Sequence, residues 1–420
     1  MAHGITRRRF LQRGGAAAGA VAGSGLLASG ARAQAAVLRC GVVTSLSGKD
    51  VLGGNLTKRG YDFWAETINQ QGGVRIGSQR VRVQMFYGDD QSTPSAGADA
   101  AERLISQEKV EAIFGPYTSG STIAVSPICD KYRVPMIAGS AESPNVWKRK
   151  PKYTFGMIPA VDLTAGKSLS VLVDQASPRP KTAAVIGVNE PFSKETAEGF
   201  HQGAKDLKLK VVRFDLIPAR ADLAPVVSSL KSANPDVVAV GGHEEVLINF
   251  VKASKSLGYR PKALIMHYGV TVPAFAEQLG KDADGTLGIT VWTPDVAYRD
   301  DIFGTAKAYD EASFKRWGTH PDYTEAACSA SGLVLQAALE KLGKLPPYSP
   351  GDREGLNAAL EKTNLTTFYG PVRFATAGDH FHCNTGLSPV LIEIRGGQQV
   401  TVGPKDAKKA DMSYPLSGWR

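Results

Sequence analysis

A group of hydroxyl side chains directly follows a short apolar run in the first third of the chain. Residues 112–114 are apolar, as expected for the buried end of a parallel strand, and Gly115-Pro116 stops the strand because proline offers no ladder donor. A helix is predicted over 121–130, and its start would present free N–H groups and the positive end of its dipole. Such a turn suits the carboxylate of a small ligand. The hydroxyls concerned are those of Tyr117, Thr118, Ser119, Ser121 and Thr122.

The same turn has a purely structural interpretation. Ser119 or Ser121 could do no more than cap the helix that begins there, because serine is a preferred residue at a helix start. The sequence of this turn leaves both interpretations open.

Three other clusters carry residue types used in metal binding or acid–base chemistry. We interpret Asp89-Asp90 as a loop cap or hinge contact. His243-Glu244-Glu245 fits part of a metal site and a helix start equally well, since acids complement the helix dipole. His380 to Cys383 has the composition of half a zinc site but no partner pair. The chain beyond residue 33 contains no G-x-S-x-G, Walker, H-E-x-x-H or G-x-G-x-x-G motif. We therefore predict no catalytic residues, no metal and no cofactor: the protein is not expected to be an enzyme.

The N-terminus reads as an export signal. Arg7 and Arg8 belong to a twin-arginine pattern, and residues 14–31 are uncharged and rich in Gly and Ala. Ala31-Arg32-Ala33 offers a cleavage site, so we predict a signal peptide over 1–33 and a periplasmic mature protein. Removing it lowers the 49 basic residues to 44 against 40 acidic ones, a net charge of +4. This weak charge, without a basic stripe, does not indicate nucleic-acid binding.

The elements that must position the hydroxyl turn alternate between strands and helices from residue 37 onward. This rhythm predicts a doubly wound parallel sheet, and the pattern restarts near residue 155 as a second α/β lobe. Long helices are expected over 301–317 and 323–342, and a third passage between the lobes over 368–374. The fold class predicted is α/β, with two Rossmann-like lobes joined by a multi-strand hinge.

The expected division of the chain follows from these crossings. Residues 34–157 form the first part of lobe 1, and 158–290 the first part of lobe 2. Residues 291–370 return to lobe 1, and 371–420 supply the hinge crossing, the completion of lobe 2 and a C-terminal tail. The four cysteines are widely spaced, and sequence alone assigns them no disulfide partners.

Ordered sequence blocks resemble the periplasmic substrate-binding proteins of branched-chain-amino-acid-type ABC transporters, which have the type I periplasmic-binding fold. The resemblance runs from about residue 38 to 394, most of the mature chain. The blocks are Leu46-Ser47-Gly48, Ile68 to Val74, Tyr87-Gly88-Asp89-Asp90, Phe114-Gly115-Pro116, Val134 to Ile137 and Tyr323 to Gly343.

The resemblance implies a ligand held between the lobes, with its carboxylate on loops of lobe 1. The positions that match the family's contacts in lobe 1 are Tyr117, Thr118, Ser119, Ala141 and Glu142, and those in lobe 2 are Phe192, His243 and Tyr268. The family's acid for an α-ammonium should lie near Tyr268, where this chain has none. Glu142, Glu190, Glu244 or Glu245 would have to substitute, or the ligand lacks an ammonium.

The function that the resemblance implies is an exported solute receptor that captures a small carboxylate or amino-acid-like ligand and delivers it to an inner-membrane ABC permease. We expect a monomer without nucleic-acid partners. The alternatives are an amide- or acid-sensing receptor on the same fold and, less favoured, a periplasmic hydrolase. Fold alone does not separate these functions.

Overall fold

The computed structural model describes residues 36–417 and 419, so the predicted signal peptide over 1–33 lies outside the described residues. Two large sheets organise the described chain, one of six strands in the order β2-β3-β1-β4-β5-β6 and one of seven in the order β17-β16-β11-β10-β9-β7-β8. We call the first sheet with its helices lobe 1 and the second lobe 2. No helix in the described range combines the length and apolarity needed to cross a membrane.

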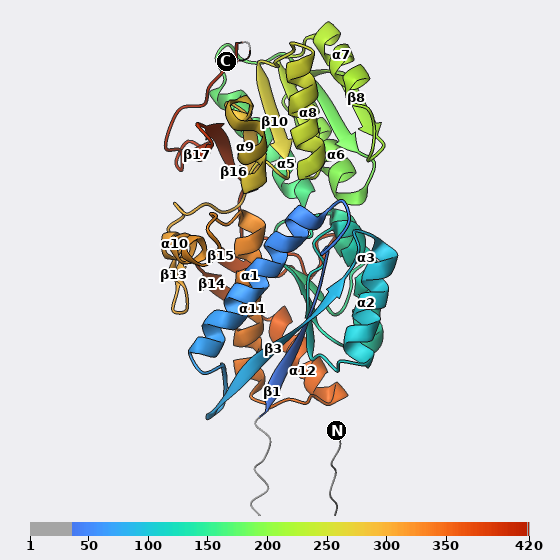
Figure 1. The fold of residues 1–420 in the computed structure, drawn as a ribbon, viewed down its shortest axis with the longest axis vertical. Coiled ribbons are helices and arrows are strands. Elements are labelled where there is room, and N and C mark those ends of the chain that lie inside the picture. The colour runs from blue at the N-terminus through green and yellow to red at the C-terminus, as the bar shows by residue number, and fades with distance from the viewer. Residues whose placement is uncertain (1–35, 418, 420) are drawn as a thin grey trace, which may run out of the picture. The chain divides into compact units, whose positions relative to one another are not determined.

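Lobe 1 is built mainly from the first part of the chain, with helices added much later in the sequence (Figure 1). Its strands are β1 (Val37–Thr44), β2 (Val74–Ile76), β3 (Gln79–Asp89), β4 (Ala112–Phe114), β5 (Met136–Ala138) and β6 (Thr154–Gly156). Its helices are α1 (Val51–Gln70), α2 (Pro94–Ser106), α3 (Ser119–Tyr132), α4 (Pro144–Lys148), α10 (Ala306–Trp317), α11 (Tyr323–Leu342) and α12 (Pro350–Glu361).

Side chains of the lobe 1 strands alternate between two separate apolar cores. On β4, Ala112 and Phe114 face the core shared with α1 and α11, whereas Ile113 faces the core shared with α2 and α3. Neighbouring Cβ atoms of a strand point to opposite faces, so both faces of this sheet are covered by helices. β1 pairs in parallel with β3 and β4, which aligns the carboxyl ends of these strands along one edge of the sheet.

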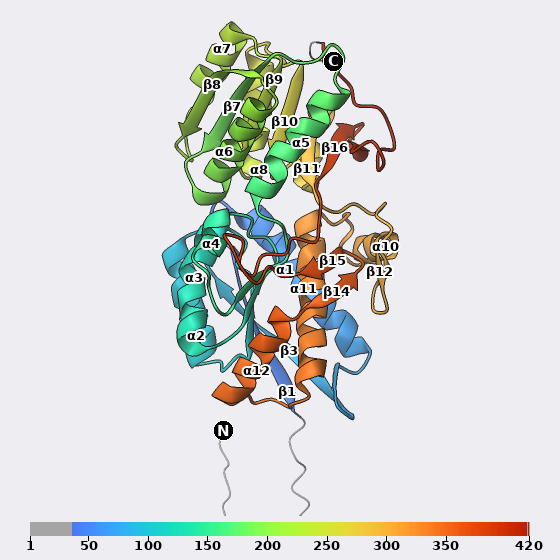
Figure 2. The same ribbon diagram turned by 180° about the vertical axis from the view of Figure 1, so that it is seen from behind.

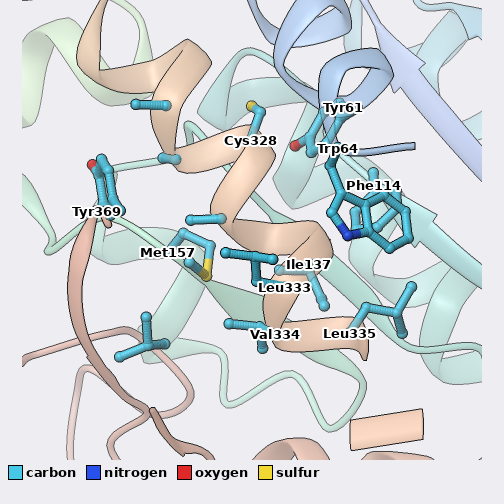
Figure 3. Packing of buried hydrophobic residues seen from close by; sticks show 14 of the residues in the cluster. Tyr61, Trp64, Phe114, Ile137, Met157, Cys328, Leu333, Val334, Leu335 and Tyr369 are labelled. Carbon is cyan, nitrogen blue, oxygen red and sulfur yellow. The ribbon is translucent and has the colours of Figure 1, made fainter. Parts of the chain in front are cut away.

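Glycines let α11 approach α1 closely even though about 250 residues separate them in sequence. A Cβ atom at Gly60 would lie 2.2 Å from the Glu325 carbonyl oxygen, and one at Gly332 would lie 2.0 Å from Cδ2 of Trp64. Figure 3 shows Tyr61 and Trp64 against one side of α11, with Met157 and Tyr369 on the other side. The late helix is therefore a central part of the lobe 1 core.

Lobe 2 repeats the same design, with α5 and α6 on one face of its sheet and α7 to α9 on the other. Its strands are β7 (Thr182–Val188), β8 (Lys210–Ile217), β9 (Val237–Gly241), β10 (Ala263–His267), β11 (Leu287–Thr290), β16 (Val390–Arg395) and β17 (Gln398–Gly403). Its helices are α5 (Val161–Gln175), α6 (Pro191–Asp206), α7 (Ala224–Ala233), α8 (Glu244–Ser256), α9 (Pro273–Leu279) and a 3₁₀ turn at Gly280–Ala283.

The chain passes between the lobes at three places: after β6, after β11 and before β16 (Figures 1 and 2). β16 pairs antiparallel with β11, and β17 with β16, so segments near the C-terminus complete the lobe 2 sheet. The α/β class with two doubly wound lobes is confirmed. The four cysteines are buried free thiols.

Two sequence-based expectations about local structure are wrong. Residues 299–305 form the hairpin β12 (Arg299–Asp300) and β13 (Gly304–Thr305), so the helix expected over 301–317 begins only at Ala306. The Asp300 carboxylate accepts the Ile302 and Phe303 N–H groups, and Gly304 has φ +75°, which together hold a turn. Likewise, 368–374 is not a passage: β14 (Asn364–Thr367) and β15 (Gly370–Arg373) form a second hairpin, and the passage follows it.

Candidate functional site

A small cavity of about 10 Å³ lies where the two lobes meet. Most of its lining residues follow the carboxyl ends of strands: β4 and β5 in lobe 1, and β7, β9 and β10 in lobe 2. This edge is where open α/β sheets bind ligands. The lining residues are Tyr117, Ser119, Ser140, Glu142, Phe192, His243, Tyr268 and Thr324.

The sequence-based site and the cavity overlap in six residues. Tyr117, Ser119 and Glu142 from lobe 1 line the cavity together with Phe192, His243 and Tyr268 from lobe 2. Segments more than 100 residues apart in sequence are therefore brought together, although their contact with a ligand remains a prediction.

Thr118 and Ala141 have structural roles beside the cavity. Thr118 is the N-cap of α3, where its Oγ1 accepts the Ser121 N–H at 3.2 Å. This corrects the expectation that Ser119 or Ser121 caps the helix. Ala141 is fully buried and packs with Val146 and Trp147.

Ser119 links the two lobe 1 loops that border the cavity. Its Oγ accepts the backbone N–H groups of Glu142 at 3.2 Å and Ser143 at 3.1 Å. Two accepted bonds occupy the lone pairs of a hydroxyl, whose hydrogen is then the group that remains for a further acceptor. Because Ser119 lines the cavity, that acceptor can belong to a ligand.

Glu244, the first residue of α8 in lobe 2, is bonded to lobe 1 through both carboxylate oxygens. Oε1 accepts the Gly53 N–H at 2.8 Å, and Oε2 accepts the Tyr117 hydroxyl at 2.9 Å. Burial raises the pKa of Glu244, against the opposing effect of His243 and of its hydrogen bonds. The acid thus joins the lobes and orients the Tyr117 ring along the cavity wall.

His243 lies between Tyr117 and a charged pair at the edge of the cavity. Its Nδ1 is 3.2 Å from the Tyr117 hydroxyl oxygen, and its Nε2 is 3.4 Å from Glu190. Lys49 of lobe 1 approaches the other oxygen of Glu190 at 3.4 Å. Burial alone would raise the pKa of Glu190, but the charges of His243 and Lys49 lower it.

Glu142 of lobe 1 faces His267 of lobe 2 in a buried pair. Glu142 Oε2 lies 2.9 Å from His267 Nε2, and Oε1 accepts the Tyr323 hydroxyl at 2.6 Å. Both side chains of the pair are at most 3% exposed. The cavity-lining carboxylate is therefore already matched by an imidazole and a phenol.

Tyr268 is held in the same manner as Tyr117. Its hydroxyl donates to Asp322 Oδ2 at 2.8 Å, and Asp322, the N-cap of α11, also accepts the Glu325 N–H. Burial raises the pKa of Asp322, although these bonds oppose the effect. The hydroxyl of this cavity-lining tyrosine is therefore already engaged within the protein.

Several residues that shape the site were not selected from the sequence. Ser140 and Thr324 line the cavity, and His267 and Asp322 hold the lining side chains in place. Ser140 lies beside Ala141 and Glu142, in the loop that the family resemblance indicated, so the sequence contained a signal for this residue. Thr324 and Asp322 had no such signal, because α11 reaches the cavity only through the tertiary fold.

Residues of the other chemistry-bearing clusters form hydrogen bonds that hold loops. Asp89 accepts the N–H groups of Leu46 and Ser47, as expected for a loop cap. Cys383 donates its thiol to the Ile158 carbonyl at the first passage between the lobes. Within the described range, no three His, Cys, Asp or Glu side chains gather in a metal-binding group.

A known protein family and curated proteins match most of this chain. A family model described as periplasmic binding protein matches residues 37–387. The Leu/Ile/Val-binding protein homolog 8 of Brucella suis is 28% identical over 411 residues, covering 94% of this chain and 98% of that protein.

Solved structures share the fold at low identity. The branched-chain amino acid transporter substrate-binding protein LivJ from Streptococcus pneumoniae, in complex with isoleucine, has a TM-score of 0.75 and 20% identity over 88% of this chain and 100% of that chain. An ABC-transporter solute-binding protein from R. palustris, in complex with benzoate, has a TM-score of 0.72 and 20% identity over 90% of this chain and 99% of that chain.

Proposed function

The chain belongs to the periplasmic binding protein family and has the type I periplasmic-binding fold, and on this basis we propose that it is the solute receptor of an ABC importer. The observation that carries the proposal is the cavity to which both lobes contribute side chains at the carboxyl ends of their strands. A ligand there would contact both lobes at once. It would therefore favour the arrangement in which they meet.

The ligand class we propose is a small carboxylate or amino-acid-like solute. Support comes from the hydroxyl of Ser119, from the start of α3 beside it and from the ring walls of Tyr117, Phe192 and Tyr268. A helix start and a hydroxyl donor suit a carboxylate, and rings suit an apolar body. The cavity of about 10 Å³ holds about one water, so binding requires the lobes to part and close again about their three connections.

Binding alone, without covalent chemistry, accounts for this site. The solute would be captured after export to the periplasm through the signal over 1–33, by a monomer that hands it to an inner-membrane permease. Replacing Arg7 and Arg8 by lysine should retain the protein in the cytoplasm if the signal is of the twin-arginine type. Fractionation of cells that express both forms tests this, and export of the variant at the normal level contradicts it.

Calorimetry with the mature chain tests the binding function. We expect saturable binding of benzoate, 4-methylpentanoate, L-leucine or L-isoleucine, accompanied by a rise in melting temperature. Product analysis of the same samples should recover each compound unchanged. A compound converted during incubation would instead support the hydrolase, and the absence of binding by all of these carboxylates would reject the proposed ligand class.

A further inference from the structure

The three buried acids around the cavity have no free oxygen for a ligand cation. Glu244 and Asp322 do not line the cavity and lie behind the rings of Tyr117 and Tyr268, whose hydroxyls donate to them. Their remaining oxygens accept the backbone N–H groups of Gly53 and Glu325. Burial raises the pKa of both acids, which weakens them further as counter-ions.

Glu142 is the carboxylate that lines the cavity, and each of its oxygens already has a partner inside the protein. His267 and Tyr323 occupy one oxygen each, at 2.9 and 2.6 Å. An amino-acid ligand would have to place its ammonium against this acid while His267 already holds it. Burying an ammonium without a dedicated acceptor is costly.

His243 brings an imidazole ring to the same cavity, with a polar partner at each nitrogen. The single hydrogen of the Tyr117 hydroxyl is donated to Glu244, so the Tyr117 oxygen acts as an acceptor toward Nδ1 of His243. Nε2 faces the Glu190 carboxylate at 3.4 Å, which is also an acceptor. An acceptor therefore lies beside each ring nitrogen, so Tyr117 and Glu190 set the orientation of the imidazole. The His243 ring packs beside the Phe192 ring, with 5.1 Å between their centroids.

From these contacts we propose that the site selects a monocarboxylate with an aromatic or branched apolar body and no amino group. The carboxylate accepts the Ser119 hydroxyl beside the start of α3, and the body packs against the rings of Tyr117, Phe192 and Tyr268. This inference rests on the proposed function and narrows its ligand class. His267 is the residue that determines specificity, because it keeps Glu142 from accepting an ammonium.

Ligand pairs that differ only by the ammonium test the inference. Phenylacetate is compared with L-phenylglycine, and 4-methylpentanoate with L-leucine, by calorimetry on the mature wild-type protein. We expect the member without the amino group to bind more tightly by about tenfold or more in at least one pair. Equal or tighter binding of L-phenylglycine and L-leucine overturns the inference but leaves the receptor function intact. No binding of any of the four overturns both.

Two variants that each release one oxygen of Glu142 test the role assigned to His267. His267→Ala and Tyr323→Phe should both shift the preference toward L-phenylglycine or L-leucine, by about fivefold or more for His267→Ala, because Glu142 regains an acceptor for the ammonium. Tyr323→Phe keeps the test valid if the loss of a buried histidine prevents folding. His201→Ala, at a ring stacked on Phe214 in lobe 2, is the matched control and should leave the ratio unchanged. An unchanged ratio in folded His267→Ala and Tyr323→Phe overturns the assignment.

Discussion

The Tyr117 hydroxyl of lobe 1 donates a 2.9 Å hydrogen bond to the buried Glu244 carboxylate of lobe 2. Because Tyr117 also lines the cavity, one side chain connects the ligand wall with the contact between lobes. A ligand that orders this ring stabilises the same contact. If the protein is the receptor proposed above, cross-lobe pairs of this kind couple ligand binding to closure of the lobes.

Removing the Tyr117 hydroxyl should weaken ligand binding and lower stability. Tyr117→Phe keeps the ring but leaves Oε2 of Glu244 without its donor, which costs about 1–3 kcal/mol. Calorimetry and chemical denaturation measure both effects. Tyr259→Phe is the matched control, since the Tyr259 hydroxyl is buried in lobe 2 and has no hydrogen-bond partner among the described residues, and it should change neither quantity by much. Equal effects of the two variants would contradict the role of the cross-lobe bond.

Gly53→Ala should impair the same contact by sterics. An added Cβ would lie 2.0 Å from Cζ of Tyr117, so the ring would have to leave the position in which it reaches Glu244. We expect affinity to fall about tenfold or more. Gly351→Ala is the control, because its nearest neighbour is the Ser349 hydroxyl at 3.8 Å and alanine favours the α12 helix. Wild-type affinity in Gly53→Ala would argue against the closed geometry of Tyr117.

The adjacent residues Thr118 and Ser119 should separate stability from binding. Thr118→Ala removes the α3 cap and should cost about 1 kcal/mol of unfolding free energy with affinity nearly unchanged. Ser119→Ala removes the acceptor for two loop N–H groups and the donor that faces the cavity, so affinity for a carboxylate should fall by about tenfold or more. Denaturation and calorimetry on both single variants check this. Unchanged affinity in Ser119→Ala would show that the Ser119 hydroxyl does not bind the carboxylate of the ligand.

Asp236 should make lobe 2 sensitive to acid. Burial alone would raise its pKa, but bonds from Lys262, Lys181 and Thr182 lower it to about 2. A carboxyl group whose pKa is lower in the folded state stabilises the protein at pH values above its unfolded pKa of 3.8. This stabilisation is lost as the pH falls toward 2. Asp236→Asn should therefore cost about 2 kcal/mol at pH 7, and less at pH 3.

Denaturation curves at several pH values test the Asp236 prediction, with Asp174→Asn as the control because that carboxylate is 63% exposed and has only surface contacts to Arg179 and the Ser170 hydroxyl among the described residues. A constant difference between wild type and Asp236→Asn from pH 7 to pH 3 would show that the charge of Asp236 contributes nothing.

The Lys49–Glu190 pair should affect how long a ligand stays bound. It connects the lobes at 3.4 Å and lies outside the cavity lining, so Lys49→Gln should speed dissociation by a few fold at low salt, as expected for a partly exposed ion pair. Stopped-flow release at low and high salt measures this. Lys194→Gln, whose partner Glu198 is on the same helix, should have no effect. If neither salt nor Lys49→Gln changes the dissociation rate, the Lys49–Glu190 pair does not help to retain the ligand.

The periodicity of apolar residues predicted most of the fold, because the positions that this pattern marks as buried are buried in the structure. The strand at 112–114 is apolar at each position since both faces of its sheet are covered, and the alternation of strands and helices required parallel pairing. The start of α10 was missed because the turn at Asp300 depends on hydrogen bonds that composition does not announce. Helix propensity alone favoured a start of α10 at residue 301, before its actual start at Ala306.

Part of the site could be predicted because its residues lie in the loops that follow strands. Ser119 was selected from such a loop, and the family resemblance indicated Phe192 and His243; all three line the cavity. A helix start was one of the two interpretations of Glu244 and is confirmed, but its bonds to Gly53 and Tyr117 arise only when the second lobe is in place. The pairing of Glu142 with His267 likewise spans 125 residues and has no local signature.

The exchange of segments between lobes dictates how the polypeptide can be assembled and divided. α11 and α12 complete lobe 1 after most of lobe 2 has been synthesised, and β16 and β17 complete lobe 2 only near the C-terminus. A nascent chain that stops before β16 leaves β11 as a bare edge, open to mispairing with another chain. Neither half can therefore be expressed from one uninterrupted stretch, and a late truncation should produce aggregation rather than an intact single lobe.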